Sequence, residues 1–363
     1  MTCLHATEPA TVYLSLAART DLSVEEVTAA LYEERSVVKQ LAMRRTVFAF
    51  PRELLPAVWG SASARVAGML TTRLAAEVES NGVAREGRAW VEQMSRTVLE
   101  SLGSDGPATT AELRERLPAL SSRLEISPGK SYGGSFPVAP RLLSALAADG
   151  RIVRGVNAGG WRTSRPQWEL TEKWLGRPVE PMDAAAGYRV LVEQWLRTFG
   201  PGTETDLVWW LGATRSAVRR ALAELGAVEV ELEEGAGLVL PDDLAEVDEP
   251  EPWAALLPVL DATTMGWKQR GFYLVDDAAR EVFDGNGNAG TTAWWNGRIV
   301  GCWTQDAAGV VQVTLLGEPG SQARRALEVE AERLTTWLRG ERVATVYPSL
   351  LMKSAGHVTR TRP

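Results

Sequence analysis

Two residues near the start of the chain carry side chains that could take part in proton transfer. His5 and Thr7 stand two positions apart in the segment His5-Ala6-Thr7, directly ahead of the helix-like stretch PATVYLSLAAR. A spacing of two places both side chains on one face if the segment is extended, and both side chains can form hydrogen bonds. Histidine can also accept a proton near neutral pH, because its unperturbed pKa is about 6.5. This pair is the first candidate for general base chemistry.

A second group of residues, all basic, lies between Gly133 and Thr171 and is suited to binding phosphate. No acidic residue stands between Gly150 and Trp168. The basic residues of this stretch are Arg141, Arg151, Arg154, Arg162 and Arg165. A helix that can enter a groove beside a cationic hairpin predicts contact with duplex DNA. The alternative is a module of the same shape that serves only for packing or protein contact.

The elements that must position these arginines are a short helix and a two-stranded ribbon. Ser135 is the expected N-cap of the helix, the leucines at positions 142–146 share one face, and Gly150 ends it. Residues 151–156 and 161–163 are expected to pair as a hairpin. Two helices come earlier, VEQMSRTVLESLG and GPATTAELRERL, and together these pieces predict a winged helix. The intervening SSRLEISPGKSYGG is expected to be a mobile loop or a spacer.

The same order of elements returns after Gly187. Two helices are followed by a third that carries Arg215 and Arg219, and then by a hairpin rich in glutamate. From Ala221 to Glu251 there are eleven acidic residues and no basic one. An acidic hairpin is repelled by phosphate, so only the helix of this copy is expected to face DNA.

A further basic segment lies near the N-terminus and predicts a third module of this kind. Between positions 35 and 52 there are five basic residues and no acid, among them Arg35, Lys39, Arg44 and Arg45. Residues 46–50 are expected to form a strand after a helix and a basic turn. The net charge of −7 argues against indiscriminate binding to nucleic acid, but the uneven placement of charge is compatible with one positive face.

Length and composition bound the class of protein. A chain of 363 residues is expected to hold two to four domains, with 45% hydrophobic residues for sizeable cores. No apolar run predicts a membrane span and the N-terminus does not resemble a signal peptide, so a cytoplasmic protein is expected. Two cysteines, Cys3 and Cys302, and two histidines, His5 and His357, are too few and too scattered to predict a zinc site or a disulfide framework.

From Trp253 the sequence is typical of β-strands, with a hairpin turn at Asn296-Gly297 and one closing helix over 323–338. With these pieces placed, the chain resembles the AlkZ/YcaQ-like DNA glycosylases. The resemblance covers nearly all of the chain and is carried by ALYEERSVVKQLAMRRT, the paired helix-turn-helix units, LLPVLDATTMGWKQRGFYL and FDGNGNAGTTAWWNGRIVGCW.

The resemblance implies an α+β fold of tandem winged helices followed by a C-terminal β-barrel-like domain. The expected boundaries are 1–88 for a winged-helix domain with the catalytic motif, 89–182 and 183–250 for two further winged helices, and 251–363 for the barrel. It also implies that Lys268, Trp294 and Trp295 lie near the lesion, although the two tryptophans could equally fill the core.

The family has a short motif, Gln, an apolar residue, then Gln or Asp, that is associated with positioning the water that attacks the sugar. This chain has His5-Ala6-Thr7 in that place, which is a departure from the pattern. Relatives also have a helix ahead of the motif, whereas only four residues precede His5 here. An alkylated purine is already a good leaving group, so neither a metal nor a redox cofactor is expected. The alternative is that His5 is a surface residue and that catalysis is lost.

The sequence therefore predicts a cytoplasmic, nucleoid-associated monomer without cofactors. It is expected to grip double-stranded DNA, alkylated or cross-linked, and to excise bulky N-alkylpurine lesions as a monofunctional DNA glycosylase. The rival hypothesis is a non-enzymatic winged-helix DNA-binding protein, either a repressor or a lesion-shielding resistance protein. A protein-interaction scaffold would leave the acid-free basic segments unexplained.

Overall fold

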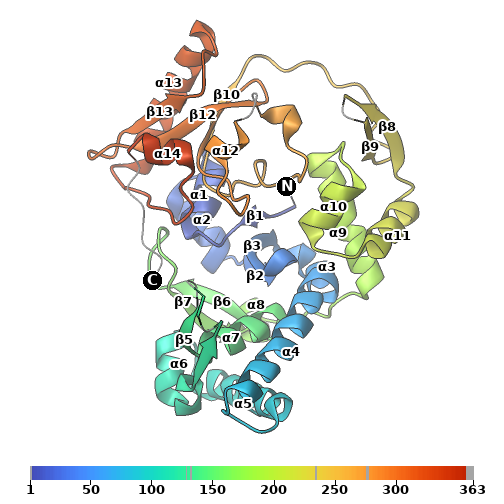
Figure 1. The fold of residues 1–363 in the computed structure, drawn as a ribbon, viewed down its shortest axis with the longest axis vertical. Coiled ribbons are helices and arrows are strands. Elements are labelled where there is room, and N and C mark those ends of the chain that lie inside the picture. Colours follow the sequence, from blue (N-terminus) through green and yellow to red (C-terminus); the bar gives the residue numbers. More distant parts are fainter. Residues whose placement is uncertain (1, 128, 131–132, 234, 275–277, 357–363) are drawn as a thin grey trace. The chain divides into compact units, whose positions relative to one another are not determined.

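Two units make up the chain in the computed structural model, which describes all residues except 1, 128, 131–132, 234, 275–277 and 357–363 (Figure 1). Unit 1 consists of residues 1–29, 161–163 and 192–363, and unit 2 of residues 30–160 and 164–191. Each unit is thus built from separated segments of the chain. The four-domain partition is a finer division and stays a prediction.

Unit 2 is mainly helical and is organised around helix α4 (Ala64–Ser80), which packs against α5 (Gly87–Ser104) and α7 (Ala139–Ala148) (Figure 1). Leucines of α7 at positions 142, 143 and 146 lie fully or almost fully buried on one face, as their helical spacing predicts. The other elements of the unit are β2 (Val37–Ala42), β3 (Thr46–Pro51), α3 (Leu55–Val58), α6 (Thr110–Arg116), β4 (Arg123–Ile126), β5 (Gly134–Pro137), β6 (Ile152–Asn157), β7 (Pro166–Leu170) and α8 (Thr171–Leu175). Helices α2 (Val24–Tyr32) and α9 (Ala184–Phe199) run across the division of the chain.

Helices α5, α6 and α7 followed by the β6–β7 hairpin reproduce the expected order of elements. Thr109 caps α6 in a capping box with Glu112. The predicted cap at Ser135 is wrong, because residues 134–137 pair with residues 123–126 in a hairpin, and the extended backbone delays the start of α7 to Ala139. Within the expected loop over 121–134, residues 123–126 and 134 are therefore strand, and residues 128 and 131–132 lie outside the described residues.

The second strand of the β6–β7 hairpin also differs from the expected 161–163. The strand that pairs with β6 is 166–170, with Trp168 opposite Arg154 and 4% exposed. Burial of this tryptophan fixes which residues face the core, and residues 161–163 lie in the connection, where they belong to unit 1.

The basic segment over 35–52 forms a hairpin. Residues 46–51 are a strand, as predicted, but they pair with residues 37–42, so a strand rather than a helix precedes the turn. Val38 and Gln40 lie opposite Phe50 and Phe48, all four are buried, and this alternation is the pattern of a half-buried strand. Arg44 and Arg45 form the turn with positive φ angles.

Unit 1 contains a four-stranded antiparallel sheet in the order β10 (Ala254–Leu257), β11 (Thr292–Trp295), β12 (Arg298–Gln305) and β13 (Val311–Leu315). Helix α13 (Ser321–Leu338) covers this sheet, and residues 323, 327, 331, 334 and 338 supply its buried face. The predicted hairpin at Asn296-Gly297 is confirmed between β11 and β12. The expected barrel is wrong, because β10 and β13 stand at the two edges of an open sheet in the described part of the chain.

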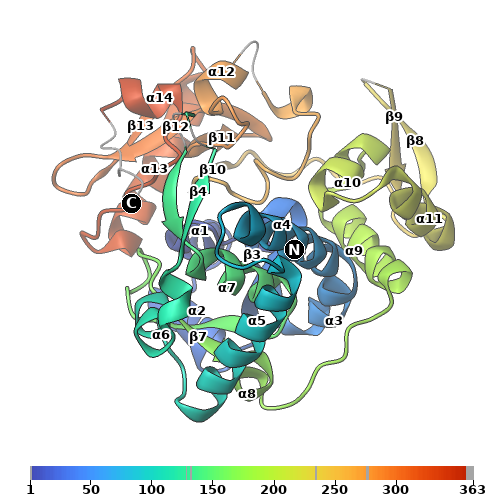
Figure 2. The ribbon, with the colours of Figure 1, turned by 60° about the horizontal axis from the view of Figure 1, so that its bottom comes forward.

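The remaining elements of unit 1 come from both ends of the chain. Figure 2 shows α10, α11 and the β8–β9 hairpin lying together, which again gives helices followed by a hairpin. These elements are β1 (Leu4–His5), α1 (Pro9–Ala17), α10 (Glu204–Leu211), α11 (Arg215–Leu225), β8 (Val228–Leu232), β9 (Gly235–Val239), α12 (Ala279–Val282) and α14 (Leu350–Ser354). Among the described helices, none combines the length and apolar character needed to cross a bilayer.

Candidate functional site

The segment that carries the predicted catalytic pair lies in unit 1. His5 ends the short strand β1 and is 7% exposed. Thr7 lies in a bend beyond the strand and is exposed. The strand ends at His5, and the shared face of the two side chains stays a prediction. His5 is thus buried, whereas Thr7 is exposed.

Hydrogen bonds on both sides of this pair fix the segment to unit 1. On one side, the fully buried Thr2 donates its hydroxyl to the carbonyl oxygen of Gln194 at 2.9 Å. On the other side, Oε1 of the buried Glu8 accepts the N–H of Val346 at 2.9 Å and the hydroxyl of Thr345 at 3.1 Å. A backbone held at both ends of a five-residue interval keeps the side chains between them in a defined position.

Helix α1, which follows directly, is anchored by the buried carboxylate of Asp261. Nη2 of Arg19 lies 2.6 Å from Oδ1 of Asp261, whose side chain is fully buried. The second carboxylate oxygen of Asp261 accepts the hydroxyl of Ser15 at 2.6 Å, and Thr11 donates to the carbonyl oxygen of Val259 at 3.0 Å. Sequence reasoning missed Glu8 and Asp261. An acid just before Pro9 at a helix start was a usable signal for Glu8, but nothing local connects Asp261 to Arg19.

Three of the predicted DNA-binding cations lie partly buried in unit 2 and pack on aromatic rings. The guanidinium carbon of Arg35 lies 4.2 Å from the ring centre of Trp174, and that of Arg154 lies 4.6 Å from the ring centre of Trp168. Nζ of Lys39 donates to the hydroxyl of Tyr32 at 2.6 Å. These contacts give all three residues a packing role inside the unit.

Burial changes the titration of two of these cations. Desolvation, with a smaller contribution from the positive charge of Arg154, lowers the pKa of Lys39 from 10.5 to about 8. Desolvation also lowers the pKa of Arg154 to about 10, so this guanidinium stays charged at neutral pH. Of these two cations, Lys39 is therefore the one that loses its charge at a pH closer to 7.

Three other predicted cations of unit 2 are exposed. Arg45 lies in the turn of the β2–β3 hairpin, and Arg151 and Arg165 flank the β6–β7 hairpin. None of these three has an ion pair among the described residues. Arg44, beside Arg45, is partly buried, and Arg141 of α7 pairs with Glu77 at 3.1 Å.

The remaining predicted arginines lie in unit 1 and are engaged with acids. Nη2 of Arg162 is 2.5 Å from a carboxylate oxygen of Glu341, and its Nη1 donates to the carbonyl oxygen of Arg342 at 2.7 Å. On α11, Arg219 lies 2.7 Å from Glu204 and Arg215 lies 4.0 Å from it. Contacts with phosphate would have to compete with these carboxylates.

The three residues predicted on the lesion side have different environments. Lys268 is exposed. Trp294 is 3% exposed, donates its indole N–H to the hydroxyl of Thr292 at 2.8 Å and packs 5.2 Å from Tyr273. Trp295 is partly buried and packs against a different core, to which helix α13 contributes. Trp294 is thus a core residue of the sheet, which agrees with the alternative that it fills the core.

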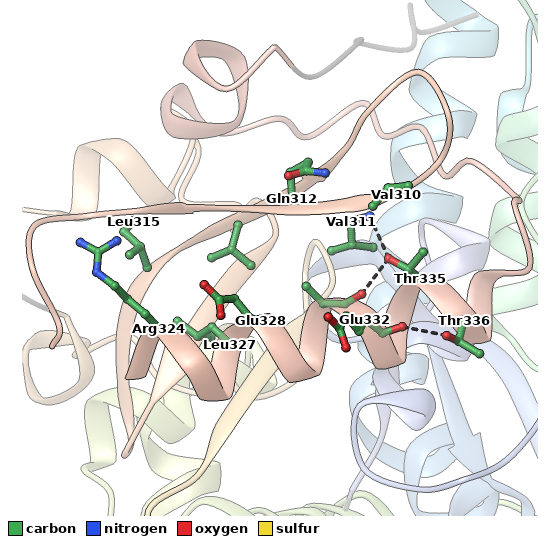
Figure 3. A pocket seen from close by; sticks show the side chains of 12 residues that line it. Val310, Val311, Gln312, Leu315, Arg324, Leu327, Glu328, Glu332, Thr335 and Thr336 are labelled. Atoms are coloured by element: carbon green, nitrogen blue, oxygen red, sulfur yellow. Dashed lines mark hydrogen bonds between the residues drawn. The ribbon is translucent and has the colours of Figure 1, made fainter. Parts of the chain in front are cut away.

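A cavity of about 640 Å³ lies between strand β13 and helix α13, and Figure 3 shows its lining. Its charged side chains, Arg324, Glu328 and Glu332, have mixed sign. Thr335 at one end accepts the backbone N–H of Val311 at 2.9 Å. None of the predicted catalytic or DNA-binding residues lines this cavity, so it does not belong to the candidate site. The described residues also contain no cluster of three histidine, cysteine or acidic side chains that could hold a metal ion.

Two comparisons with known proteins place the chain. A family model described as DNA glycosylase AlkZ-like matches residues 1–337, which include the His5 segment. The solved structure of Streptomyces sahachiroi DNA glycosylase AlkZ is similar in fold, with a TM-score of 0.70 and 20% identity over 94% of this chain and 90% of that chain. No significant match was found among curated protein sequences.

Proposed function

Because the chain belongs to the AlkZ-like DNA glycosylase family, we propose that it is a monofunctional DNA glycosylase that excises bulky or cross-linking N-alkylpurines. The observation that carries this proposal is the family match through the His5 segment, a segment that Thr2 and Glu8 hold on either side. A fixed side chain at this place suits the aiming of one water molecule.

The proposed reaction requires little chemistry from the protein. Alkylation at a ring nitrogen gives the purine a positive charge, so the base leaves with the electron pair of the glycosidic bond and becomes neutral. Water adds to the resulting oxocarbenium-like sugar at C1′. In this proposal His5 orients the water and takes its proton, and Thr7 supplies a further hydrogen bond.

We further propose that DNA is gripped through phosphate contacts rather than base edges. Arg45, Arg151 and Arg165 are the strongest candidates for these contacts, because they are exposed and lack ion pairs among the described residues. The helix, helix, helix, hairpin order seen in α5–β7 and in α9–β9 supports tandem winged helices. A monomeric state and association with the nucleoid remain part of the same proposal.

Release of the modified base from a duplex with a single N7-alkylguanine tests the function. The wild-type protein should produce the free alkylated base and an abasic strand that breaks only after alkaline treatment. Tight binding of the duplex without any release would overturn the glycosylase and leave a DNA-binding or lesion-shielding protein. This alternative is kept because His5-Ala6-Thr7 departs from the family motif that is associated with positioning the attacking water.

A further inference from the structure

A second cavity of unit 1, of about 310 Å³, is lined by aromatic rings. It lies where the turn before α10 meets the β8–β9 hairpin and the loop over 267–272. Its walls include the three aromatic residues Phe199, Trp267 and Phe272. Neither residue of the predicted catalytic pair contributes to it.

The aromatic wall offers a ring face to a ligand. The ring centres of Phe199 and Phe272 each lie 5.1 Å from that of Trp267, in edge-to-face geometry. Phe272 is 49% exposed, which is unusual for a phenylalanine and leaves its ring accessible from the cavity side. A planar ligand can stack on such a surface.

The walls of this cavity are tied together by hydrogen bonds. Oδ1 of Asp206, a residue that is 1% exposed, accepts the backbone N–H groups of Lys268 and Gln269 at 2.8 and 2.9 Å. The indole N–H of Trp267 donates to the carbonyl oxygen of Phe199 at 3.1 Å. Gly202 and Leu238 exchange backbone hydrogen bonds, which fixes the hairpin to the turn. The cavity is therefore formed before any ligand binds.

The charged residues that line the cavity are acidic. Its charged lining residues are Asp206 and Glu233, and Asp206 is already occupied by its hydrogen bonds. Glu233 has no ion pair among the described residues. Two more acids, Glu229 and Glu231, stand on β8 of the same hairpin. A ligand with a phosphate group would be repelled here, whereas a cation would be attracted.

Aromatic rings and a carboxylate around one cavity form a recognition surface for a planar cation, since ring faces attract positive charge. Thr203 donates its one hydroxyl proton to Oδ2 of Asp206 at 2.7 Å, and the side-chain amide of Gln269 lies 2.9 Å from the same hydroxyl oxygen at the cavity wall. We propose that this cavity binds a cationic, planar heteroaromatic ring without phosphate, of the class of N7-alkylated purines. The choice of purines within this class rests on the proposed function.

Binding of 7-methylguanosine by the full chain tests the site, with guanosine as the neutral analogue, at mildly acidic pH where the methylated ring keeps its charge. Calorimetric titration of the wild-type protein should give about tenfold tighter binding of 7-methylguanosine. Glu233→Gln should reduce that preference by about fivefold and leave guanosine binding nearly unchanged. Phe272→Ala should weaken both ligands. Glu229→Gln, on the same hairpin but outside the cavity lining, is the matched control and should behave as the wild type.

Equal affinity for the two nucleosides, or an unchanged preference in Glu233→Gln, would overturn the proposed site. Tighter binding of the 5′-monophosphate of 7-methylguanosine than of the nucleoside would also contradict it. The assay separates this proposal from the proposed function. Base release without nucleoside binding would remove the site and keep the glycosylase, whereas nucleoside binding without base release would do the reverse.

Discussion

At the scale of single residues, the geometry around His5 depends on partners that are distant in sequence. Glu8 is bound by Thr345 and Val346, and Arg19 is bound by Asp261. The sequence predicted the candidate catalytic pair, because residue type and spacing are local information. It could not predict these partners, because an ion pair across 242 positions leaves no local pattern.

Removing the buried carboxylate of Asp261 should strongly destabilise the protein. Asp261→Ala leaves the hydroxyl of the fully buried Ser15 without its acceptor, whereas Arg19 still donates to the carbonyl oxygen of Ser15 at 2.8 Å. We expect a loss of about 1 to 3 kcal/mol in the free energy of unfolding, measured by chemical denaturation, because a buried hydroxyl group is left unsatisfied. The exposed pair of Arg324 and Glu318 in the same unit provides the control. Arg324→Ala should cost under about 1 kcal/mol, and equal effects of the two changes would contradict this role for Asp261.

At the scale of elements, helices with clear apolar periodicity were predicted well and hairpins less well. The buried leucines of α7 and the capping box of α6 are set by local spacing. The strand β2 was missed because its inward-facing positions include the polar Gln40, whose amide is satisfied by the hydroxyl of Ser63 at 2.8 Å. Ser63 is 23 positions away in the sequence, so no local pattern shows that Gln40 has a buried partner. The polar Gln40 therefore interrupts the alternation of apolar residues that would have indicated a strand.

The turn of the β2–β3 hairpin is expected to contact a phosphate through Arg45. The affinity of the wild-type protein for duplex DNA should fall steeply with salt and depend little on sequence. Arg45→Gln should weaken all duplexes by a similar factor and make the salt slope shallower by about one unit. Arg220→Gln is the control, because Arg220 is exposed but paired with Glu224 at 2.7 Å. A slope that Arg45→Gln leaves unchanged would show that this turn does not touch DNA.

The same hairpin carries a group whose titration should be visible in stability. The pKa of Lys39 is lowered to about 8 in the folded protein, against 10.5 for an unperturbed lysine. The unfolded chain therefore binds more protons between these pH values, and stability rises with pH through this window. Relative to the wild type, Lys39→Met should gain on the order of 1 to 3 kcal/mol at neutral pH and lose this advantage toward pH 10.5. A difference between the two proteins that is independent of pH would contradict the shift.

At the scale of the whole molecule, many of the helices were predictable, but the grouping of the elements into two units was not. Residues 161–163, which were predicted to form one strand of a hairpin, belong to unit 1, whereas the rest of that hairpin belongs to unit 2. Trp161 packs 5.5 Å from Tyr13 and 5.8 Å from Trp337, in contacts that join three distant parts of the sequence. The closed barrel was expected from family resemblance rather than from strand pattern, and the open edges of β10 and β13 correct it.

Single-turnover release of N7-alkylguanine by the wild type, His5→Ala and His5→Gln across pH tests the central claim most directly. If His5 takes the proton of the attacking water, His5→Ala should reduce the rate by roughly 10²-fold or more while DNA affinity stays nearly constant. His5→Gln restores the residue typical of the family, so it should keep partial activity and lose any rate dependence on a group titrating near pH 6 to 7, about the unperturbed pKa of histidine. Release by His5→Ala at the wild-type rate would contradict the assignment.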